Sequence, residues 1–354
     1  MEPQLDRGVL AAAVGRHYGL TVRVVDFIPV GETAWCYRVT DDGGARWFLK
    51  LGRPGAIEPG RGEFSLRLGE ALAGLGLPVP RPRRTRAGEL WCWLDGLRVA
   101  VFEFVDGRSL DDQDLRLPEL ARRVARLVAA VHAATPRLAG SVPFTETFEV
   151  WTDGLQRCLA GLGPGAVGLV AEARALVWPQ RGALLGMQQR VQMLGQAARS
   201  QPGERVLCHG DLIGDNLLGD RGGRLWAVDW DGAALAPRER DLALFTGQGF
   251  ERFLEDYRAD VGALDLDPTL VAFFLLRRNL DDLVDWLGAV LAADRPEQQR
   301  RADLDGVRWC LSRWGELEAR IDHTRLLARR QRSIDVQQRV AHALLACCCA
   351  LAVG

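Results

Sequence analysis

The sequence predicts an α+β protein with two lobes, in which a small antiparallel sheet precedes a larger, mainly helical part. Three observations support this prediction. The chain has 354 residues, which is long for a single hydrophobic core. Its first hundred residues contain short runs of β-branched and aromatic residues separated by Gly-containing turns. Beyond about residue 106, apolar residues recur at spacings of three and four, as in helices.

The first lobe is predicted to span residues 1–105. It begins with a helix over residues 4–18, and a second helix over residues 62–75 ends at Gly76. Residues 77–82 are expected to be extended, because a residue that precedes proline is disfavoured in the α region. The predicted strands are the β-branched and aromatic runs 21–28, 35–40, 46–51, 90–94 and 97–104.

The second lobe is predicted to span residues 106–335 and to be mainly helical. Residues 145–200 have helical spacing with an interruption at 161–168, and the chain beyond Asp241 is almost entirely helical in pattern. An early helix is indicated by one apolar stripe: Leu117, Leu120, Val124, Leu127 and Val131.

Residues 336–354 are set apart as an apolar tail of unknown role. The segment is rich in Ala, Leu, Val and Cys and is too short to span a bilayer. Two interpretations stay open, namely a terminal helix that docks on the core and an extension that is disordered or non-native.

Composition excludes several classes of partner. The net charge is −1, which gives no support for attraction to nucleic acid or to a membrane surface. The amino terminus lacks the pattern of a secretory signal. Eight cysteines occur without any CxxC pair, which favours buried free thiols in a reducing compartment. We therefore expect a cytoplasmic protein with neither a nucleic-acid nor a membrane partner, and the oligomeric state is left open.

The strongest motif begins at His209 and contains Asp211 and Asn216, with Asp229 a short distance further on. Asp211 is suited to orient a hydroxyl group and accept its proton, while Asn216 and Asp229 are suited to hold the Mg²⁺ that bridges nucleotide phosphates. Apolar runs on both sides of the turn at 219–223 predict a hairpin that brings Asn216 and Asp229 together. His209 is expected to bond the loop backbone and not to act as the base.

Lys50 is the only lysine in the chain, and it ends a predicted strand. A lysine at this position of a kinase pairs with the α- and β-phosphates and with an acidic residue of the next helix. Glu63 is the preferred acidic partner, with Glu58 and Glu70 as the alternatives.

Two backbone segments are candidates for nucleotide contacts. Residues 99–107 form a strand that runs into a Gly-containing turn, where the backbone of Glu103 and Val105 is expected to pair with a nucleotide base. An ordinary strand between lobes explains the same letters. The loop 30–35 contains one glycine, so a Gly-rich cradle is absent, but the Thr33 hydroxyl or backbone N–H groups could contact phosphate.

Acceptor binding has the weakest signal. Acidic side chains near the phosphoryl site would suit a cationic acceptor, whereas ordinary solvated helix faces are the alternative interpretation. A second acidic set on a helix consists of Glu251, Glu255 and Asp256. The acceptor candidates are Asp231, Asp281, Asp282 and Asp285.

The motifs around Asp211, Asn216 and Asp229 resemble those of the aminoglycoside phosphotransferase and choline kinase superfamily. The Asp-Trp-Asp segment followed by residues 235–242, and the segment 278–285, are most similar to its spectinomycin phosphotransferase branch. The resemblance covers roughly residues 20–320 and implies a bilobal protein-kinase-like fold with ATP-dependent O-phosphorylation.

By this resemblance Asp211 is the catalytic base, Asn216 and Asp229 are Mg²⁺ ligands, and Lys50 binds phosphate. The chain departs from relatives at Ile213, where they often have a polar residue, commonly His. The sequence thus predicts an ATP- and Mg²⁺-dependent O-phosphotransferase for a small molecule, with an aminocyclitol antibiotic such as spectinomycin as the preferred acceptor. A metabolic kinase for choline, homoserine or a sugar is the alternative, and a nucleotide-binding pseudokinase is a third reading.

Overall fold

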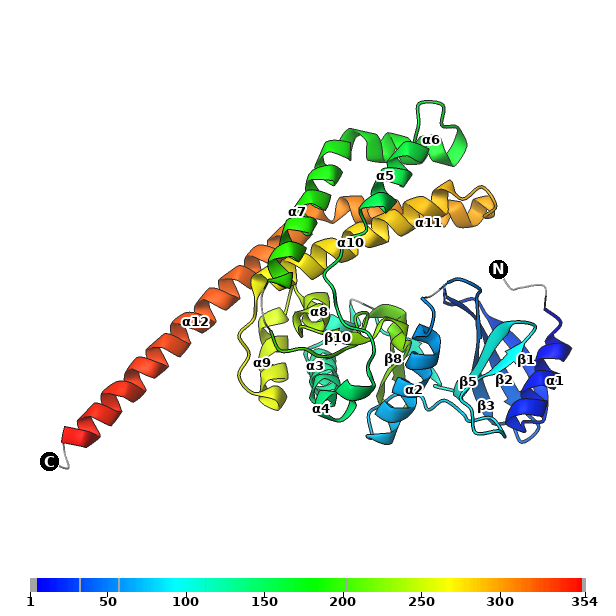
Figure 1. The fold of residues 1–354 in the computed structure, drawn as a ribbon, viewed down its shortest axis with the longest axis horizontal. Helices are drawn as coiled ribbons and strands as arrows, with labels where there is room; N and C mark the ends of the chain where they lie inside the picture. Colours follow the sequence, from blue (N-terminus) through cyan, green and yellow to red (C-terminus); the bar gives the residue numbers. More distant parts are fainter. Residues whose placement is uncertain (1–4, 32, 57, 112, 201–202, 352–354) are drawn as a thin grey trace. The chain divides into compact units, whose positions relative to one another are not determined.

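The computed structural model describes residues 5–31, 33–56, 58–111, 113–200 and 203–351, with side chains up to residue 333 (Figure 1). The chain forms two compact units. Unit 1 comprises Met1–Thr145, Arg205–Ala236 and Ala259–Val261. Unit 2 comprises Glu146–Glu204, Pro237–Arg258 and Gly262–Gly354. The lobes predicted from the sequence, with boundaries after residues 105 and 335, are a different division from these two units, and they stay a prediction.

Unit 1 contains a five-stranded antiparallel sheet with the strand order β1-β2-β3-β5-β4. The five strands predicted from the sequence are confirmed, with boundaries shifted by one or two residues. They are β1 (Val22–Ile28), β2 (Ala34–Asp41), β3 (Arg46–Gly52), β4 (Cys92–Leu94) and β5 (Leu97–Glu103).

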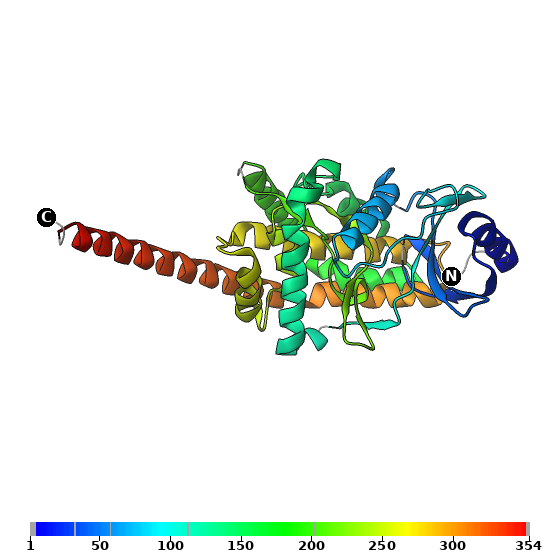
Figure 2. The same ribbon diagram turned by 90° about the horizontal axis from the view of Figure 1, so that it is seen from below.

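One helix covers each face of this sheet, as Figures 1 and 2 show. Alternation along β3 and β5 sends Leu49 and Val99 into the core beneath α1 (Arg7–Tyr18). The other face packs Ala100 against Leu66 of α2 (Arg61–Gly74). The side chains of β3 and β5 that point away from the α1 core therefore lie on the face of the sheet that carries α2.

The remainder of unit 1 contains two small sheets, ordered β10-β7 and β6-β8-β9, whose connecting segments carry Asp211, Asn216 and Asp229. Leu217 pairs with Ala227, so the predicted hairpin is confirmed. Its tip is closed by Asp220, whose carboxylate accepts the Arg224 N–H at 2.8 Å. The strands are β6 (Gly107–Ser109), β7 (Val206–Cys208), β8 (Leu217–Asp220), β9 (Leu225–Ala227) and β10 (Ala234–Ala236).

The helix predicted after residue 117 is present as α3 (Pro118–Ala133). Val124, Leu127 and Val131 are buried as expected. Leu117 is a correction to the predicted stripe, because it precedes the helix and is 57% exposed. Pro118 occupies the first turn, where a missing backbone N–H costs no hydrogen bond, and so it fixes the start of the helix after Leu117.

Unit 2 is mainly helical, and its core lies where α10 packs against α5, α6, α7 and α11. The predicted break at residues 161–168 separates α5 from α6. The helices are α5 (Thr152–Gly161), α6 (Gly168–Val177), α7 (Arg181–Arg199), α8 (Glu239–Leu242), α9 (Phe250–Val261), α10 (Pro268–Leu291), α11 (Glu297–Ser312) and α12 (Trp314–Leu351). Shorter helical turns of the chain are α4 (Thr135–Leu138), η1 (Asp114–Arg116), η2 (Ala139–Ser141), η3 (Trp178–Gln180), η4 (Gly214–Asn216), η5 (Trp230–Gly232) and η6 (Ala243–Phe245).

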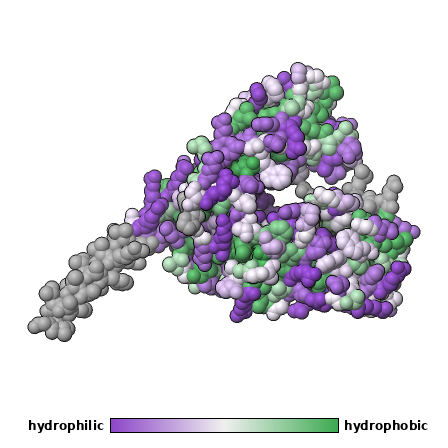
Figure 3. Space-filling view, in the orientation of Figure 1, coloured by the Kyte–Doolittle hydropathy of each residue, from purple (hydrophilic) through white to green (hydrophobic). Residues whose placement is uncertain are grey.

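The surface carries hydrophilic and hydrophobic residues interspersed over the face seen in Figure 3, and hydrophobic colour gathers where unit 2 carries α6. Val167, directly before α6, is 80% exposed. Within the described part of the chain, no helix combines the length and apolar character needed to span a membrane.

The tail predicted at residues 336–354 continues α12 as far as Leu351, but its side chains lie outside the described residues. Its docking therefore stays open, and the run Cys347–Cys349 belongs to this part of the chain. The five cysteines that are described are free and buried, in agreement with the thiols expected from the sequence.

Candidate active site

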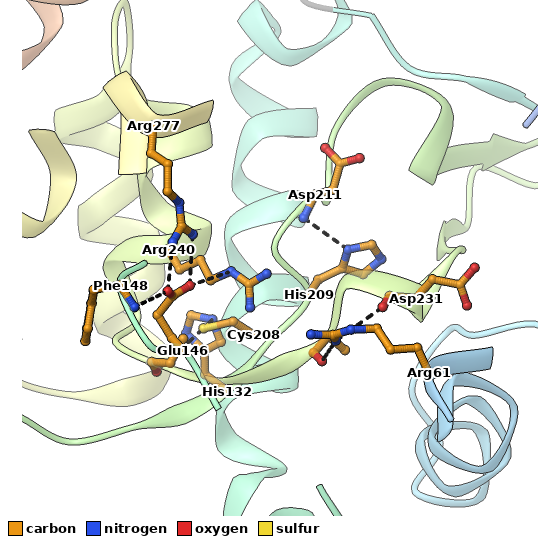
Figure 4. A network of polar contacts seen from close by, with 12 residues as sticks. Arg61, His132, Glu146, Phe148, Cys208, His209, Asp211, Asp231, Arg240 and Arg277 are labelled. Carbon is orange, nitrogen blue, oxygen red and sulfur yellow. Dashed lines mark hydrogen bonds and ion pairs between the residues drawn. The ribbon is translucent and has the colours of Figure 1, made fainter. Parts of the chain in front are cut away.

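The loop that follows β7 is organised by a buried histidine. His209 is fully buried, and its Nε2 lies 2.9 Å from the carbonyl oxygen of Val228. The backbone N–H of Asp211 donates to its Nδ1 at 3.3 Å (Figure 4). These two partners assign the proton to Nε2 and the acceptor role to Nδ1. Both ring nitrogens are thus engaged with backbone, as the sequence predicted for His209.

Asp211 and Asn216 are joined directly across this loop. The Nδ2 of Asn216 donates to the Asp211 carboxylate at 2.7 Å and to the Asp211 carbonyl at 3.0 Å. Both hydrogens of the Asn216 side-chain amide are therefore donated to Asp211. The hydrogen bonds that the Asn216 side chain makes to the described residues use Nδ2 alone, so its Oδ1 is left for another ligand.

The hairpin brings Asn216 and Asp229 to the same place. The Val228 N–H donates to the Asn216 carbonyl at 3.0 Å, and Asp229 follows at once. Asp229 has a φ of 64°, in the left-handed region that residues with a side chain rarely adopt. Such backbone strain concentrates at functional sites because the surrounding structure must hold it in place.

Lys50 lies against the carboxylates of this hairpin. Its Nζ is 2.8 Å from Asp229 and 3.9 Å from Asp231. Burial disfavours the charged ammonium, but the two carboxylates outweigh this effect and raise the pKa of Lys50. Burial likewise opposes ionisation of Asp229, and the nearby ammonium outweighs it and lowers the Asp229 pKa. The pKa of Asp231 is raised by burial, with a further contribution from the charge of Asp229.

A cavity of about 360 Å³ within unit 1 opens onto these groups. Its walls are largely apolar, which is typical of small-molecule sites with a few placed polar groups. Val105, one of its lining residues, makes no backbone hydrogen bond to the part of the chain that the structure describes. The site residues predicted from the sequence that line it are Thr33, Lys50, Glu103, Val105, Asn216, Asp229 and Asp231.

The expected ion pair between Lys50 and Glu63 is not formed, which corrects the sequence analysis. Glu63 instead accepts from Nη1 of Arg98 at 3.1 Å. The reason is tertiary, because the long guanidinium of Arg98 reaches the first turn of α2 while Asp229 engages the Lys50 ammonium. The alternatives fail as well, since Glu58 pairs with Arg61 at 3.1 Å and Glu70 pairs with Arg84 at 2.5 Å.

Asp231 was predicted as an acceptor residue, and this role stays a prediction. It lines the cavity beside Lys50, as does Ser65. Arg61 of α2 donates to the carbonyls of Asp231 at 3.4 Å and Ala233 at 3.1 Å (Figure 4). Asp231 therefore belongs to the Lys50 cluster, and α2 is tied to the loop that carries it.

The three other acceptor candidates lie on α10 in unit 2. Asp282 pairs with Arg278 at 3.7 Å, and Asp285 is exposed. Asp281 is different, because burial raises its pKa to about 6 despite the opposing charge of Arg277. A carboxylate that titrates so close to neutrality is the strongest acceptor candidate of the three.

The second acidic helical set has a structural explanation. Arg252 of α9 lies 3.4 Å from Asp256 and 4.0 Å from Glu255. Glu146, which is buried in unit 2, likewise receives two hydrogen bonds from Arg277 and lies 3.8 Å from Arg240 (Figure 4). The Glu146 pairs join different elements of unit 2, whereas the Arg252 pairs lie within α9.

Sequence reasoning missed some residues that line the cavity, among them Arg98, Ser65 and Asp215. Arg98 could have been found from its spacing, because it lies two residues before Ala100 in a strand. Residues two apart in a strand point to the same face of the sheet.

Comparison with known proteins adds a family. A model described as the phosphotransferase enzyme family, APH, matches residues 26–278. Protein StrN of Streptomyces griseus is 29% identical over 230 residues, which cover 62% of this chain and 68% of that protein.

Solved structures with the same fold include spectinomycin phosphotransferase APH(9)-Ia in complex with ADP and spectinomycin. It matches with a TM-score of 0.72 at 19% identity, covering 87% of this chain and 94% of that one. Macrolide 2'-phosphotransferase MphH from Brachybacterium faecium matches with a TM-score of 0.55 at 19% identity, over 84% and 97% of the two chains. Plasmodium vivax ethanolamine kinase matches with a TM-score of 0.57 at 15% identity, over 87% and 88%. The predicted α+β, protein-kinase-like fold is confirmed.

Proposed function

The chain belongs to the phosphotransferase enzyme family, and from this premise we propose that it transfers the γ-phosphate of ATP to a hydroxyl group of a small molecule. One observation carries the proposal: the contact of Lys50 with Asp229 at 2.8 Å at the wall of a cavity that Asn216 also lines. Asn216 is in turn bonded to Asp211, so a phosphate-binding cation, two metal-ligating side chains and a base are connected.

The nucleotide fits the cavity of unit 1. Apolar residues such as Phe48 and Phe102 offer walls for a base, and the backbone groups of Val105 are available to pair with its edge. Lys50 belongs to the polar part of the lining, and it is suited to bind the α- and β-phosphates. The solved complexes of spectinomycin phosphotransferase with ADP and with AMP support nucleotide use by this fold.

The residues present fit Mg²⁺, which prefers hard oxygen ligands and takes only one or two carboxylates from a protein. Asp229 supplies a carboxylate, and Asn216 supplies the Oδ1 that its contacts with Asp211 leave unused. Bound there, Mg²⁺ would offset negative charge on the nucleotide phosphates. The Lys50 ammonium, which now faces Asp229 and Asp231, would be available to phosphate oxygens.

Asp211 is proposed to accept the proton of the acceptor hydroxyl. The hydroxyl oxygen bonds to the γ-phosphorus as the bond from that phosphorus to the β,γ-bridging oxygen breaks, and ADP leaves. Asn216 fixes the carboxylate through its 2.7 Å hydrogen bond, and the Asp211 N–H is fixed by His209. Such positioning lowers the barrier because the base is held in place before the acceptor arrives.

For the acceptor we propose a cationic small molecule, best an aminocyclitol antibiotic such as spectinomycin, so that the activity would confer antibiotic resistance. Asp281 supports a cation because it is a carboxylate held in a desolvated place. Trp151 supports it as well. It is 79% exposed, and α5 runs parallel to α10, with Gly154 beside Val284 and Gly161 beside Leu291. That register places Trp151 at the level of Asp281, where its ring could face an ammonium group.

The cytoplasm is the proposed location, because ATP is supplied there and because the described cysteines are free thiols. A kinase for choline, homoserine or a sugar is the second candidate. Ethanolamine and choline kinases share the fold, which is what favours it.

The test is Asp211→Asn, assayed for ADP formation with spectinomycin, aminoglycosides, choline and homoserine as acceptors. General-base catalysis contributes roughly 10²–10⁴-fold, so the variant should lose about that factor in kcat and keep its affinity for Mg·ADP. Asp42→Asn, at an exposed carboxylate of unit 1 that does not line the cavity, is the matched control and should keep most of the rate. Full turnover by a folded Asp211→Asn protein would contradict the assignment. Turnover of choline or homoserine alone would select the metabolic kinase, and nucleotide binding without turnover would select the pseudokinase.

A further inference from the structure

Arg98 lies on the same face of the sheet as Lys50. Lys50 pairs with Ala100 across β3 and β5, and alternation along β5 puts Arg98 and Ala100 on one face. Lys50 and Arg98 both line the cavity proposed for the nucleotide. Among the described residues that line it, they are the lysine and the arginine. The cavity wall that carries the Lys50 ammonium thus also carries the Arg98 guanidinium.

Two glycines make room for this guanidinium. A Cβ at Gly62 would lie 1.7–2.1 Å from Nη2, Cζ and Nη1 of Arg98. Gly52 faces Arg98 from β3, with its Cβ position 3.7 Å from the same Nη2. Gly62 sits in the first turn of α2 without a positive φ, and glycine in a helix costs about 1 kcal/mol relative to alanine. Space for Arg98, and not backbone freedom, is therefore what glycine provides at position 62.

The guanidinium keeps most of its hydrogen-bonding capacity. Its one hydrogen bond to a described residue is from Nη1 to Glu63 at 3.1 Å, whereas a guanidinium carries five N–H donors. Its side chain is 18% exposed, so the group is largely desolvated yet reachable. Lys50, by contrast, already faces two carboxylates. A planar fork with unused donors is the arrangement that binds phosphate oxygens in pairs.

We propose that Arg98 is a second phosphate-binding residue of the nucleotide cavity, held in place by Glu63 and admitted by Gly62. The inference rests on the proposed nucleotide-dependent function and adds a residue to its binding site. Asp229 and Asp231 offset the charge of Lys50, so Arg98 supplies the positive charge that a polyphosphate needs on this wall. Glu63 then serves as the anchor of Arg98 and not of Lys50.

The test compares adenosine, AMP, ADP and ATP as ligands of wild type and Arg98→Ala by calorimetry. A lost charge-assisted phosphate contact should weaken ADP and ATP about ten- to a hundredfold and leave adenosine unchanged. Equal weakening of adenosine and ADP binding would overturn the proposal, because it would mean that Arg98 maintains the shape of the cavity and does not contact phosphate. Unchanged affinity for ADP and ATP would overturn it as well.

Gly62→Ala keeps Arg98 and its charge but occupies the space of the guanidinium. It should reproduce the phosphate-dependent loss, and because alanine favours the helix it should not unfold the protein. Gly74→Ala at the end of the same helix is the matched control, since no neighbouring atom lies within 4 Å of its Cβ position. Wild-type affinity for ADP and ATP in Gly62→Ala would contradict the role given to this glycine and to Arg98.

The double variant Arg98→Ala with Glu63→Gln separates a direct contact from mere neutralisation of Glu63. A direct contact predicts that affinity for ADP stays low in the double variant. Restored affinity would mean that Arg98 only offsets the Glu63 charge, and the proposal would be wrong. Failure of the wild type to bind ADP at all would instead count against the proposed function, so the two failures can be told apart.

Discussion

At the scale of single residues, the site depends on how each charge is compensated. The Lys50 ammonium is partly buried beside Asp229 and Asp231, and the directions of the pKa shifts follow from the competition between burial and charge. The same competition has another outcome on α10. Burial dominates at Asp281 and raises its pKa to about 6, even though Arg277 lies nearby.

This raised pKa gives a testable pH dependence. If Asp281 binds a cationic acceptor as a carboxylate, acceptor affinity should rise as pH increases from 5 to 7, since the ionised fraction grows by about tenfold across a pKa of 6. Acceptor Kd measured by calorimetry on the Mg·ADP complex should fall accordingly. Asp281→Asn should flatten the curve, and Asp285→Asn is the exposed control. A wild-type Kd that is constant over this range would rule out Asp281 as the cation ligand.

The same shift has a consequence for stability, with a definite sign. Between its ordinary pKa and about 6, Asp281 holds more protons in the folded protein than in the unfolded chain. Its contribution to the free energy of unfolding is therefore fully present at low pH and is lost as pH rises through that window. Comparing wild type with Asp281→Asn should show the wild type losing stability relative to the variant from pH 4 to 6.

At the scale of elements, α10 and α11 meet through a glycine. A Cβ at Gly306 of α11 would lie 2.5–2.8 Å from ring atoms of Trp286 on α10. Gly306→Ala gains about 1 kcal/mol in helix propensity, but overpacking a rigid indole costs about 1–3 kcal/mol. We expect a net loss of stability, measured as a lower urea midpoint.

Gly288 on α10 supplies the matched control for that substitution. No atom lies within 4 Å of its Cβ position, and the residue is exposed. Gly288→Ala should stabilise the protein by about 0.5–1 kcal/mol, because only the propensity gain applies. A gain in both variants would show that α11 moves freely away from Trp286.

Elements were predictable to the extent that local signals specify them. The strands of the first sheet and the hairpin after Asn216 follow from alternation and turn glycines, and both are observed. The partner of Lys50 was not predictable, because Arg98 reaches Glu63 across 35 residues of sequence and only the packing of α2 on β5 reveals that contact. The contact of Asp231 with Lys50 was not predictable for the same reason, since the two residues come from different elements.

At the scale of the whole molecule, the two proposed ligand sites draw on residues of different units. The lining of the nucleotide cavity comes from unit 1 alone, whereas Asp281 and Trp151 belong to unit 2. Nucleotide affinity should therefore be insensitive to changes on α10. Because the chain has two units, its thermal unfolding can show more than one transition, and ligand effects must be assigned to each separately.

Thermal unfolding with Mg·ADP tests this division. A ligand present at about 100 times its Kd stabilises the folded state that binds it by about 2.7 kcal/mol. Calorimetry of the wild type should show a shift of the unit 1 transition with ADP that becomes larger when Mg²⁺ is present. Asp229→Ala should abolish the Mg²⁺-dependent part, because it removes a carboxylate ligand and the partner of Lys50. Asp281→Asn should keep the whole shift. An undiminished shift in Asp229→Ala would place the metal elsewhere, and a lost shift in Asp281→Asn would show that unit 2 takes part in nucleotide binding.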